Sequence, residues 1–489
     1  MNISLNNYLY FLIKKYKSLD NCYKKLFSSI LIWVVVDVLL YFLVSGDIFF
    51  RISILTSSVI LFIEVIMIIK RTRMLFSPIV IFLLSFFLFQ SGNLFLLALN
   101  VDVSMHHFES MIDLLPKVSL FTSISNVFAG LAGVMASLKD YEIKSVLDDI
   151  NVNHKDFIAN AIFFPLVFIS IILVSLSLYE FFVFGINGGR YQIVEFESNF
   201  SVFLSFIRIF RLLYGPFIIL FLTYSRNKKS KNIFIALGIL WAVFETLNGN
   251  RTNTVALILG LILFSYYSTL DEHKRNKISF KIIVLGLLLM FLIVFVSSFR
   301  ITGNLSESLK QNSNFIVRFI SELGGSSLVL FTSMSIVPSV EGFLYGKQFL
   351  FSFLKGIIPS VIDFTGIIGK FAADFDIFDR WMTKYFSYNF GLGQSINQEA
   401  YINFGWFGLI AIFFICYFIF FNLSPNFKKG KELNKYALYK STTLLMLWVM
   451  LPRQSLITMW NGYFWGIIVV VCYIKISEFI FNKLKNKRK

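Results

Sequence analysis

The chain has 489 residues, of which 57% are hydrophobic and only 15% are charged. A soluble domain of this length could not bury so much apolar surface, so the composition excludes a soluble enzyme and indicates one integral membrane domain over residues 1–489. The net charge of +17 would suggest nucleic acid as a partner in a soluble protein. In a membrane protein it first reflects sidedness, so no nucleic-acid partner is expected.

Twelve apolar runs are long enough to cross a bilayer as helices, which predicts an all-α polytopic membrane protein. They cover residues 26–45, 50–69, 76–99, 118–138, 158–181, 202–224, 232–248, 252–270, 280–299, 402–422, 434–451 and 455–479. The first run lacks a small-residue cleavage site after it, so it is expected to be a retained anchor. The three cysteines form neither a disulfide framework nor a zinc spacing.

The basic residues divide unevenly between the two sides of this map. With the N-terminus in the cytoplasm, the segments on the inner side carry 28 basic residues. The five short outer loops carry one each: Arg51, Lys117, Arg190, Arg251 and Arg453. Because basic residues favour the cytoplasmic side, both termini are predicted to be cytoplasmic.

The segment 300–400 then falls outside the membrane as one long loop. Its apolar stretches are shorter than the twelve runs, and one of them is strongly one-sided. Arg318 and Glu322 lie on one helical face, and the apolar side chains on another are Phe315, Ile316, Phe319, Ile320 and Leu323. This pattern, and the stretch from Phe349 to Ile358, predict helices lying on the membrane surface.

Arginine is unusually frequent in the outer half of the map. Nine Arg and six Lys lie outside or in outer membrane halves, whereas only five of the 28 inner basic residues are Arg. Sidedness selects positive charge but not arginine. Arginine binds phosphate oxygens in a planar fork and stays charged when desolvated, so the outer face is predicted to bind a phosphate-bearing ligand.

Four of these arginines define the predicted anion site. Arg208 and Arg211 are three residues apart near the outer end of one run, so they share a helical face. Arg251 and Arg453 each precede an inward-running helix, whose N-terminal N–H groups would also attract an anion. The alternative is that these side chains only anchor helix ends at the interface.

Two further groups of residues could take part in catalysis or metal binding, but the sequence supports them less strongly. His106 and His107 lie in an outer loop, where either could act as a general base or simply be solvated. Asp374 and Asp376 form an Asp-x-Asp triplet of the kind that holds a metal-bound nucleotide sugar, or that arises by chance. Nucleotide sugars are absent outside the cell, so no metal and no cofactor is predicted. No Walker loop, HExxH or GxSxG motif occurs.

The segment that follows the long loop carries the most specific pattern. It runs from Gly391 and contains Ser395, then Glu399-Ala-Tyr401-Ile-Asn403-Phe404-Gly405-Trp-Phe-Gly408. This resembles the Ser…Glu-x-Tyr-x-Asn-Phe-Gly-x-x-Gly element of bacterial oligosaccharide repeat-unit polymerases, the O-antigen polymerases of Wzy type. Three other features of that family are similar: Gly249-Asn-Arg251-Thr252, in which Thr252 replaces a glycine; Glu341-Gly342-x-x-Tyr345-Gly346 followed by Pro359; and Arg453 before the last run.

The resemblance implies a metal-independent membrane glycosyltransferase of GT-C-like architecture. It would polymerise undecaprenyl-diphosphate-linked oligosaccharide repeat units into O-antigen or capsule, at the outer face of the bacterial cytoplasmic membrane. The implied partners are these lipid-linked oligosaccharides, the bilayer and, as a candidate, a chain-length-regulating membrane protein.

Roles for individual residues follow from combining the resemblance with the arginine pattern. Arg251, Arg453 and Glu399 are predicted to be catalytic, with Glu399 accepting the acceptor's proton; alternatively, Glu399 only satisfies N–H groups at a helix start. Tyr401 and Asn403 are predicted to contact the glycan. The predicted diphosphate ligands are Arg208, Arg211, Arg251, Arg300 and Arg453. Gly405 and Gly408 are expected at close helix contacts.

Three rival functions remain open from the sequence. A flippase for lipid-linked oligosaccharides would need similar basic residues, but it predicts charges deep along several runs and short loops throughout. An O-antigen ligase type enzyme would use the same donor with a different acceptor. A membrane protein that only binds the carrier would not need Glu399.

Overall fold

The computed structural model describes residues 21–101, 103, 109–138, 157–184, 201–248, 251–269, 271–302, 314–358, 382–383, 385–387, 393–423, 427–429 and 432–486. The first half contains the helices α2 (Asn21–Leu43), α3 (Gly46–Thr72), α4 (Pro78–Ala98), η1 (Glu109–Leu114), α5 (Leu115–Ser137), α6 (Phe157–Phe184), α8 (Ser201–Tyr224) and α9 (Lys228–Leu247).

The second half contains α10 (Arg251–Tyr267), α11 (Glu272–Thr302), α13 (Phe315–Gly324), α14 (Ser327–Ile336), α15 (Lys347–Ile357), α18 (Ile396–Phe404), η2 (Gly405–Phe407), α19 (Gly408–Asn422), α20 (Lys435–Trp448), η3 (Leu451–Arg453), α21 (Leu456–Tyr463), η4 (Phe464–Val469) and α22 (Val470–Asn486). Between α19 and α20, β1 (Lys428–Lys429) pairs antiparallel with β2 (Glu432–Leu433).

The all-helical membrane architecture predicted from the sequence is confirmed, since each of the twelve apolar runs falls on a helix. Within the described ranges, nine helical stretches are long and apolar enough to cross a membrane. Two further apolar helices, Ile209–Tyr224 and Thr254–Tyr267, are shorter. One of the nine, Phe315–Ile336, lies in the segment expected to be an outer loop with short apolar stretches. The number of crossings therefore stays a prediction.

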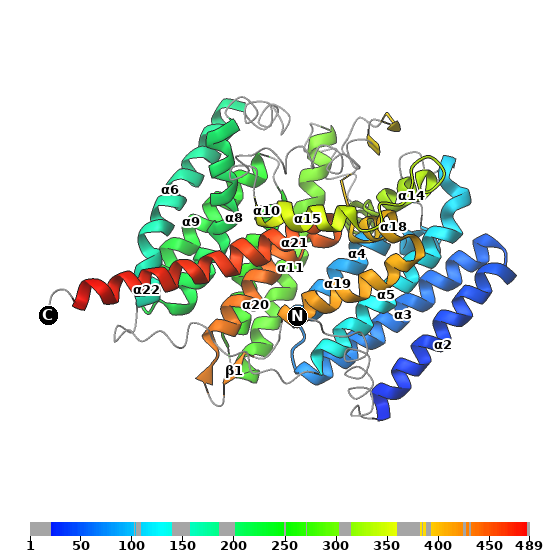
Figure 1. Ribbon diagram of the computed structural model, residues 1–489, viewed down its shortest axis with the longest axis horizontal. Helices are drawn as coiled ribbons and strands as arrows, with labels where there is room; N and C mark the ends of the chain where they lie inside the picture. The colour runs from blue at the N-terminus through cyan, green and yellow to red at the C-terminus, as the bar shows by residue number, and fades with distance from the viewer. Residues whose placement is uncertain are drawn as a thin grey trace.

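The helices form one body in which segments far apart in sequence pack together, such as α5 with α19 and α4 with α13 (Figure 1). α6, α8 and α9 stand together on one side, and α2, α3, α5 and α19 lie on the other. α20 packs against α8 and α10 and also against α4 and α19, so it joins the two sides. The short helices α14, α15 and α18 lie along one edge, and the lysine-rich β1–β2 hairpin lies at the opposite edge (Figure 1).

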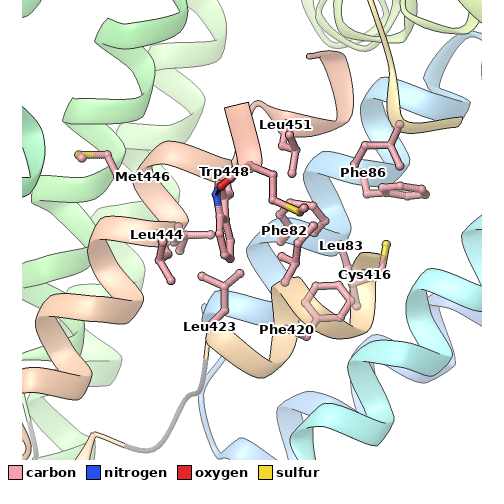
Figure 2. Packing of buried hydrophobic residues seen from close by; sticks show 14 of the residues in the cluster. Phe82, Leu83, Phe86, Cys416, Phe420, Leu423, Leu444, Met446, Trp448 and Leu451 are labelled. Atoms are coloured by element: carbon pink, nitrogen blue, oxygen red, sulfur yellow. Dashed lines mark hydrogen bonds between the residues drawn. The ribbon is translucent and has the colours of Figure 1, made fainter. Parts of the chain in front are cut away.

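Large apolar side chains fill the space where α4, α19 and α20 meet (Figure 2). Phe82 of α4 and Phe420 of α19 pack edge to face with ring centroids 5.4 Å apart. Trp448, at the end of α20, is fully buried, and its indole N–H donates to the Met459 carbonyl at 3.1 Å. A buried indole N–H needs such an acceptor, and this one fastens α20 to α21.

Two helices within the segment predicted to be an outer loop are partly or wholly buried against other helices. α13 has the predicted one-sided character, and its Phe319 is buried where the helix packs against α4. α14 is buried along almost its whole length, including Ser327, Leu330 and Thr332. Both helices thus pack into the helical body, α13 against α4 and α14 against α18.

Candidate functional site

A buried ion-pair network joins α6, α8 and α9. The Nη2 atom of Arg211, on α8, lies 3.3 Å from Oε1 of Glu180 on α6 and 3.3 Å from Oε1 of Glu245 on α9. The side chains of Glu180 and Glu245 are 2% and 1% exposed, whereas that of Arg211 is 13% exposed. Both carboxylates therefore lie inside the protein, and the guanidinium lies nearer its surface.

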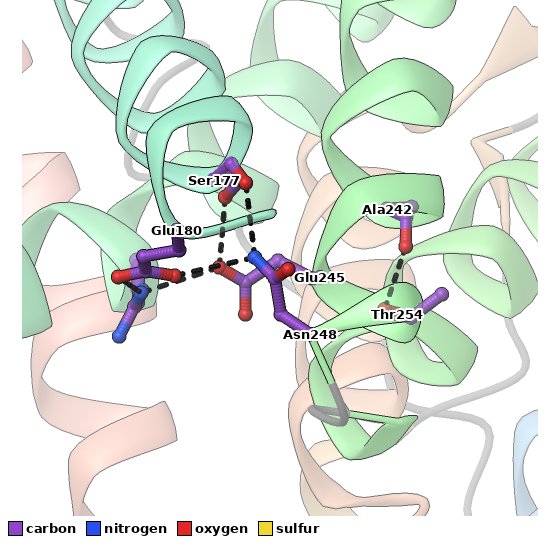
Figure 3. A network of polar contacts seen from close by, with 7 residues as sticks. Ser177, Glu180, Ala242, Glu245, Asn248 and Thr254 are labelled. Atoms are coloured by element: carbon purple, nitrogen blue, oxygen red, sulfur yellow. Dashed lines mark hydrogen bonds and ion pairs between the residues drawn. The ribbon is translucent and has the colours of Figure 1, made fainter. Parts of the chain in front are cut away.

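Neutral groups complete this network (Figure 3). The Ser177 hydroxyl donates to Oε1 of Glu245 at 2.9 Å, and the Asn248 amide donates to Oε2 of Glu180 at 3.3 Å and to the Ser177 carbonyl at 3.0 Å. Buried carboxylates need such donors as well as a counter-charge, because desolvation otherwise disfavours their charged form.

A cavity of about 220 Å³ lies beside the network. Its polar wall contains Arg211 together with Gln454, which precedes α21, and Thr458 and Asn461 of α21. The remaining wall is mostly apolar and comprises Leu212, Gly215, Trp241, Ala256, Leu257, Met446, Leu447 and Met450. The cavity can thus receive a ligand with an anionic head and an apolar continuation.

The structure brings together the elements that carry four of the predicted arginines: Arg208, Arg211, Arg251 and Arg453. Arg211 lines the cavity itself. Arg251 is the first residue of α10, whose Ala256 and Leu257 line the same cavity, and Arg453 directly precedes Gln454. Arg208 lies on α8 and Arg300 on α11. The side chains of Arg208, Arg251 and Arg300 lie outside the described part of the structure.

Arg453 is accessible to solvent, but the protein around its guanidinium partly desolvates it. Desolvation lowers the pKa of its guanidinium, and the negative charge of Glu322 on α13 opposes that shift. An arginine stays charged under such conditions. Arg453 therefore offers a fixed positive charge at the point where α13 approaches the start of α21.

Glu399 is fully buried on α18, and it holds the start of another helix. The backbone N–H of Leu456, the first residue of α21, donates to Oε1 and Oε2 of Glu399 at 3.2 and 3.3 Å. The next N–H, of Ile457, donates to the Ser455 hydroxyl at 3.2 Å. These two N–H groups already have acceptors within the protein, although the sequence predicted that they would attract an external anion.

The residues assigned to the glycan are also buried. Tyr401 is 1% exposed and donates its hydroxyl to the Val337 carbonyl at 3.2 Å. Asn403 is 0% exposed, and its Oδ1 accepts from the backbone N–H of Gln348 at the start of α15, at 3.3 Å. Their assignment to the glycan stays a prediction, and in this structure both side chains bind main-chain groups.

The glycines of the same motif occupy crowded positions. Gly405 has a positive φ of 57°, and an added Cβ would lie 3.0 Å from the Phe343 ring. A Cβ on Gly408 would lie 2.5 Å from the Ala400 carbonyl oxygen. The chain therefore needs glycine to turn from α18 into α19, and we call the buried set Glu399, Tyr401, Asn403, Gly405 and Gly408 the α18 hub.

The sequence pattern did not single out Glu180 and Glu245, because the predicted site was defined by basic residues. Their signal was an acidic residue inside an apolar run, which is costly in a membrane. His106, His107 and the Asp374–Asp376 triplet lie outside the described residues. In the ranges that the structure describes, no three His, Cys, Asp or Glu side chains gather as metal ligands would.

Comparison with known proteins adds the family. A family model described as O-antigen polysaccharide polymerase Wzy matches residues 25–485. No curated protein and no solved structure matches the chain. The chain belongs to this family, so it is a multi-pass membrane enzyme of glycosyltransferase type that polymerises lipid-linked oligosaccharide repeat units into O-antigen.

Proposed function

We propose that this member of the O-antigen polysaccharide polymerase Wzy family uses undecaprenyl diphosphate as the lipid carrier and acts at the outer face of the bacterial cytoplasmic membrane. The growing glycan moves from its carrier to the non-reducing end of a fresh lipid-linked repeat unit. O-antigen is the product class of the family, and capsule is the alternative product that the same chemistry serves.

The cavity beside Arg211 carries this proposal. It sets a guanidinium and the polar side chains of Gln454, Thr458 and Asn461 against an apolar wall that includes Leu257 and Met446. A polyprenyl diphosphate has the same two parts in sequence, an anionic head and a hydrocarbon chain. We place the diphosphate at Arg211, with Arg208, Arg251, Arg300 and Arg453 as further ligands.

The transfer needs charge stabilisation and one proton acceptor. The acceptor hydroxyl oxygen bonds to the anomeric carbon, the bond from that carbon to the diphosphate oxygen breaks, and its electron pair stays on the diphosphate. The hydroxyl proton is released. Fixed arginines in a dry site stabilise the departing negative charge without a metal, as in a GT-C-like enzyme that uses no nucleotide sugar.

Two roles compete for Glu399. As a general base it would take the acceptor's proton; as a structural anchor it holds the Leu456 N–H and so fixes Arg453, three residues earlier. Glu399→Gln separates them. Loss of turnover with unchanged carrier binding and unchanged heat stability favours the base, whereas a lowered unfolding temperature with normal turnover per folded molecule favours the anchor.

The orientation rests on charge. The lysine-rich β1–β2 hairpin and the short helices α14, α15 and α18 lie at opposite edges (Figure 1), which supports a cytoplasmic hairpin and an outer site. Cysteines introduced at Ser313 and Asn486 test this in intact cells. An impermeant thiol reagent should label the first, and labelling of the second would overturn both the orientation and the cytoplasmic C-terminus.

The function is tested by gene deletion and by reconstitution. Cells without the protein should make single lipid-linked repeat units but no polymer, and the purified protein in liposomes should polymerise units extracted from those cells. If lipid-linked units instead accumulate in the cytoplasmic leaflet and are absent from the outer leaflet, the protein is a flippase. Transfer to lipid A core without chain growth would indicate a ligase. Altered chain length when a membrane partner is co-reconstituted would identify the chain-length regulator.

A further inference from the structure

The two carboxylates on Arg211 need an explanation that the proposed diphosphate site does not give. A site built only to attract an anion would not place Glu180 and Glu245 against its arginine. Both use the same nitrogen, Nη2, at 3.3 Å, and both are almost fully buried. Bringing two carboxylates into a membrane domain costs free energy, so mere snorkelling of Arg211 to the interface does not account for them.

The network also offers each carboxylate a second hydrogen-bond donor. Ser177 donates to the Glu245 oxygen that faces Arg211, and Asn248 donates to the other oxygen of Glu180. Each acid therefore has a hydrogen-bond donor that does not depend on Arg211. Glu180 lies on α6 and Glu245 on α9, and neither of them lines the cavity.

We propose that Glu180 and Glu245 are positioning residues that hold the Arg211 guanidinium in the cavity wall and limit its affinity for a polyprenyl diphosphate. The inference rests on the proposed function, because it concerns the same diphosphate. Its consequence is product release: the arginine stabilises charge as the diphosphate departs, and the carboxylates keep the freed carrier from staying bound.

The signs of the effects follow from electrostatics. Removing one negative charge beside Arg211, in Glu180→Gln or Glu245→Gln, should tighten the binding of undecaprenyl diphosphate by roughly three- to tenfold. Ser177→Ala should change the affinity in the opposite direction. Without that hydroxyl, the Glu245 oxygen interacts more strongly with Arg211, so binding should weaken by about twofold.

The experiment measures the Kd of undecaprenyl diphosphate for the full-length protein in nanodiscs. Arg211→Gln and the double variant Arg211→Gln/Glu245→Gln complete a double-mutant cycle, in which the double variant should bind no more tightly than Arg211→Gln alone. Glu64→Gln is the matched control, because Glu64 is a fully buried carboxyl on α3, away from this cavity. It should leave the Kd unchanged.

Unchanged affinity in both glutamine variants of the acids would overturn the inference, as would an equal effect of Glu245→Gln with and without Arg211. If these variants do not fold, the Kd of the Ser177→Ala variant decides. Weaker binding supports the inference, and unchanged or tighter binding overturns it. The binding cycle needs no polymerisation. If the variants show the predicted binding cycle but the wild-type protein makes no polymer, only the proposed function is refuted.

Discussion

The α18 hub and the Arg211 network are both buried polar clusters, but their partners differ. The hub side chains bind the main chain: Glu399 holds the Leu456 N–H, Tyr401 donates to the Val337 carbonyl, and Asn403 accepts from Gln348. The Arg211 network joins ionised side chains of three helices, and its arginine reaches a cavity. The first arrangement fixes chain geometry, and the second presents a charge to a ligand.

This difference explains why the more recognisable pattern need not be the chemical one. Main-chain partners demand particular side chains and glycines at fixed spacings, so the hub forms a continuous motif. An ion-pair network needs only suitable charges on neighbouring helices, and its members are scattered over residues 177–248 of the chain. Substitutions should therefore separate the two regions, with losses of turnover near the arginines and losses of stability at the hub.

The largest effect is expected from Arg251→Lys and Arg453→Lys. Each variant keeps its positive charge and its place at the start of a helix but loses the planar fork. We expect turnover in liposomes to fall by about 100–1,000-fold, as when one donor to a developing negative charge is removed, with little change in unfolding temperature. Full activity in both variants would show that these arginines only anchor helix ends.

A loss of stability should come next, at the glycine that joins α18 to α19. Gly408→Ala would place a Cβ 2.5 Å from the Ala400 carbonyl oxygen, so the backbone must shift. Forcing extra atoms into such a contact typically costs about 1–3 kcal/mol. The unfolding temperature should fall, while turnover per folded molecule stays normal. Gly342→Ala is the control, because a Cβ there meets nothing within 4 Å.

Asn403→Ala tests the glycan assignment directly. The substitution removes the side chain that accepts from the Gln348 N–H at the start of α15, which should cost about 1 kcal/mol of stability. The KM for the lipid-linked acceptor should not change. A raised KM at an unchanged unfolding temperature would show instead that Asn403 binds the glycan, as the sequence analysis predicts.

The helices could be predicted from the sequence because hydropathy and length are local properties of the chain. Hydrogen-bond partners can lie far apart in the sequence. The motif containing Tyr401 and Asn403 could therefore be recognised, but the main-chain groups that these residues bind could not be predicted. The acids illustrate the same limit. Asp37, Glu64, Glu180 and Glu245 all interrupt apolar runs, and only the packing places Glu180 and Glu245 against Arg211, Asp37 against Ser53 and Glu64 against Gly130.

The smallest expected effect belongs to Tyr401→Phe. The ring stays in place between Phe121 and Phe343, whose centroids lie 5.6 and 6.0 Å from its own, and only the hydroxyl bonded to the Val337 carbonyl is lost. One neutral hydrogen bond contributes about 0.5–1.5 kcal/mol, so thermal unfolding should shift slightly and turnover should hold. Because the hydroxyl is already bonded inside the protein, a marked fall in acceptor affinity would mean that Tyr401 leaves this position to meet the glycan. That result would move the α18 hub from the framework of the enzyme to its substrate site.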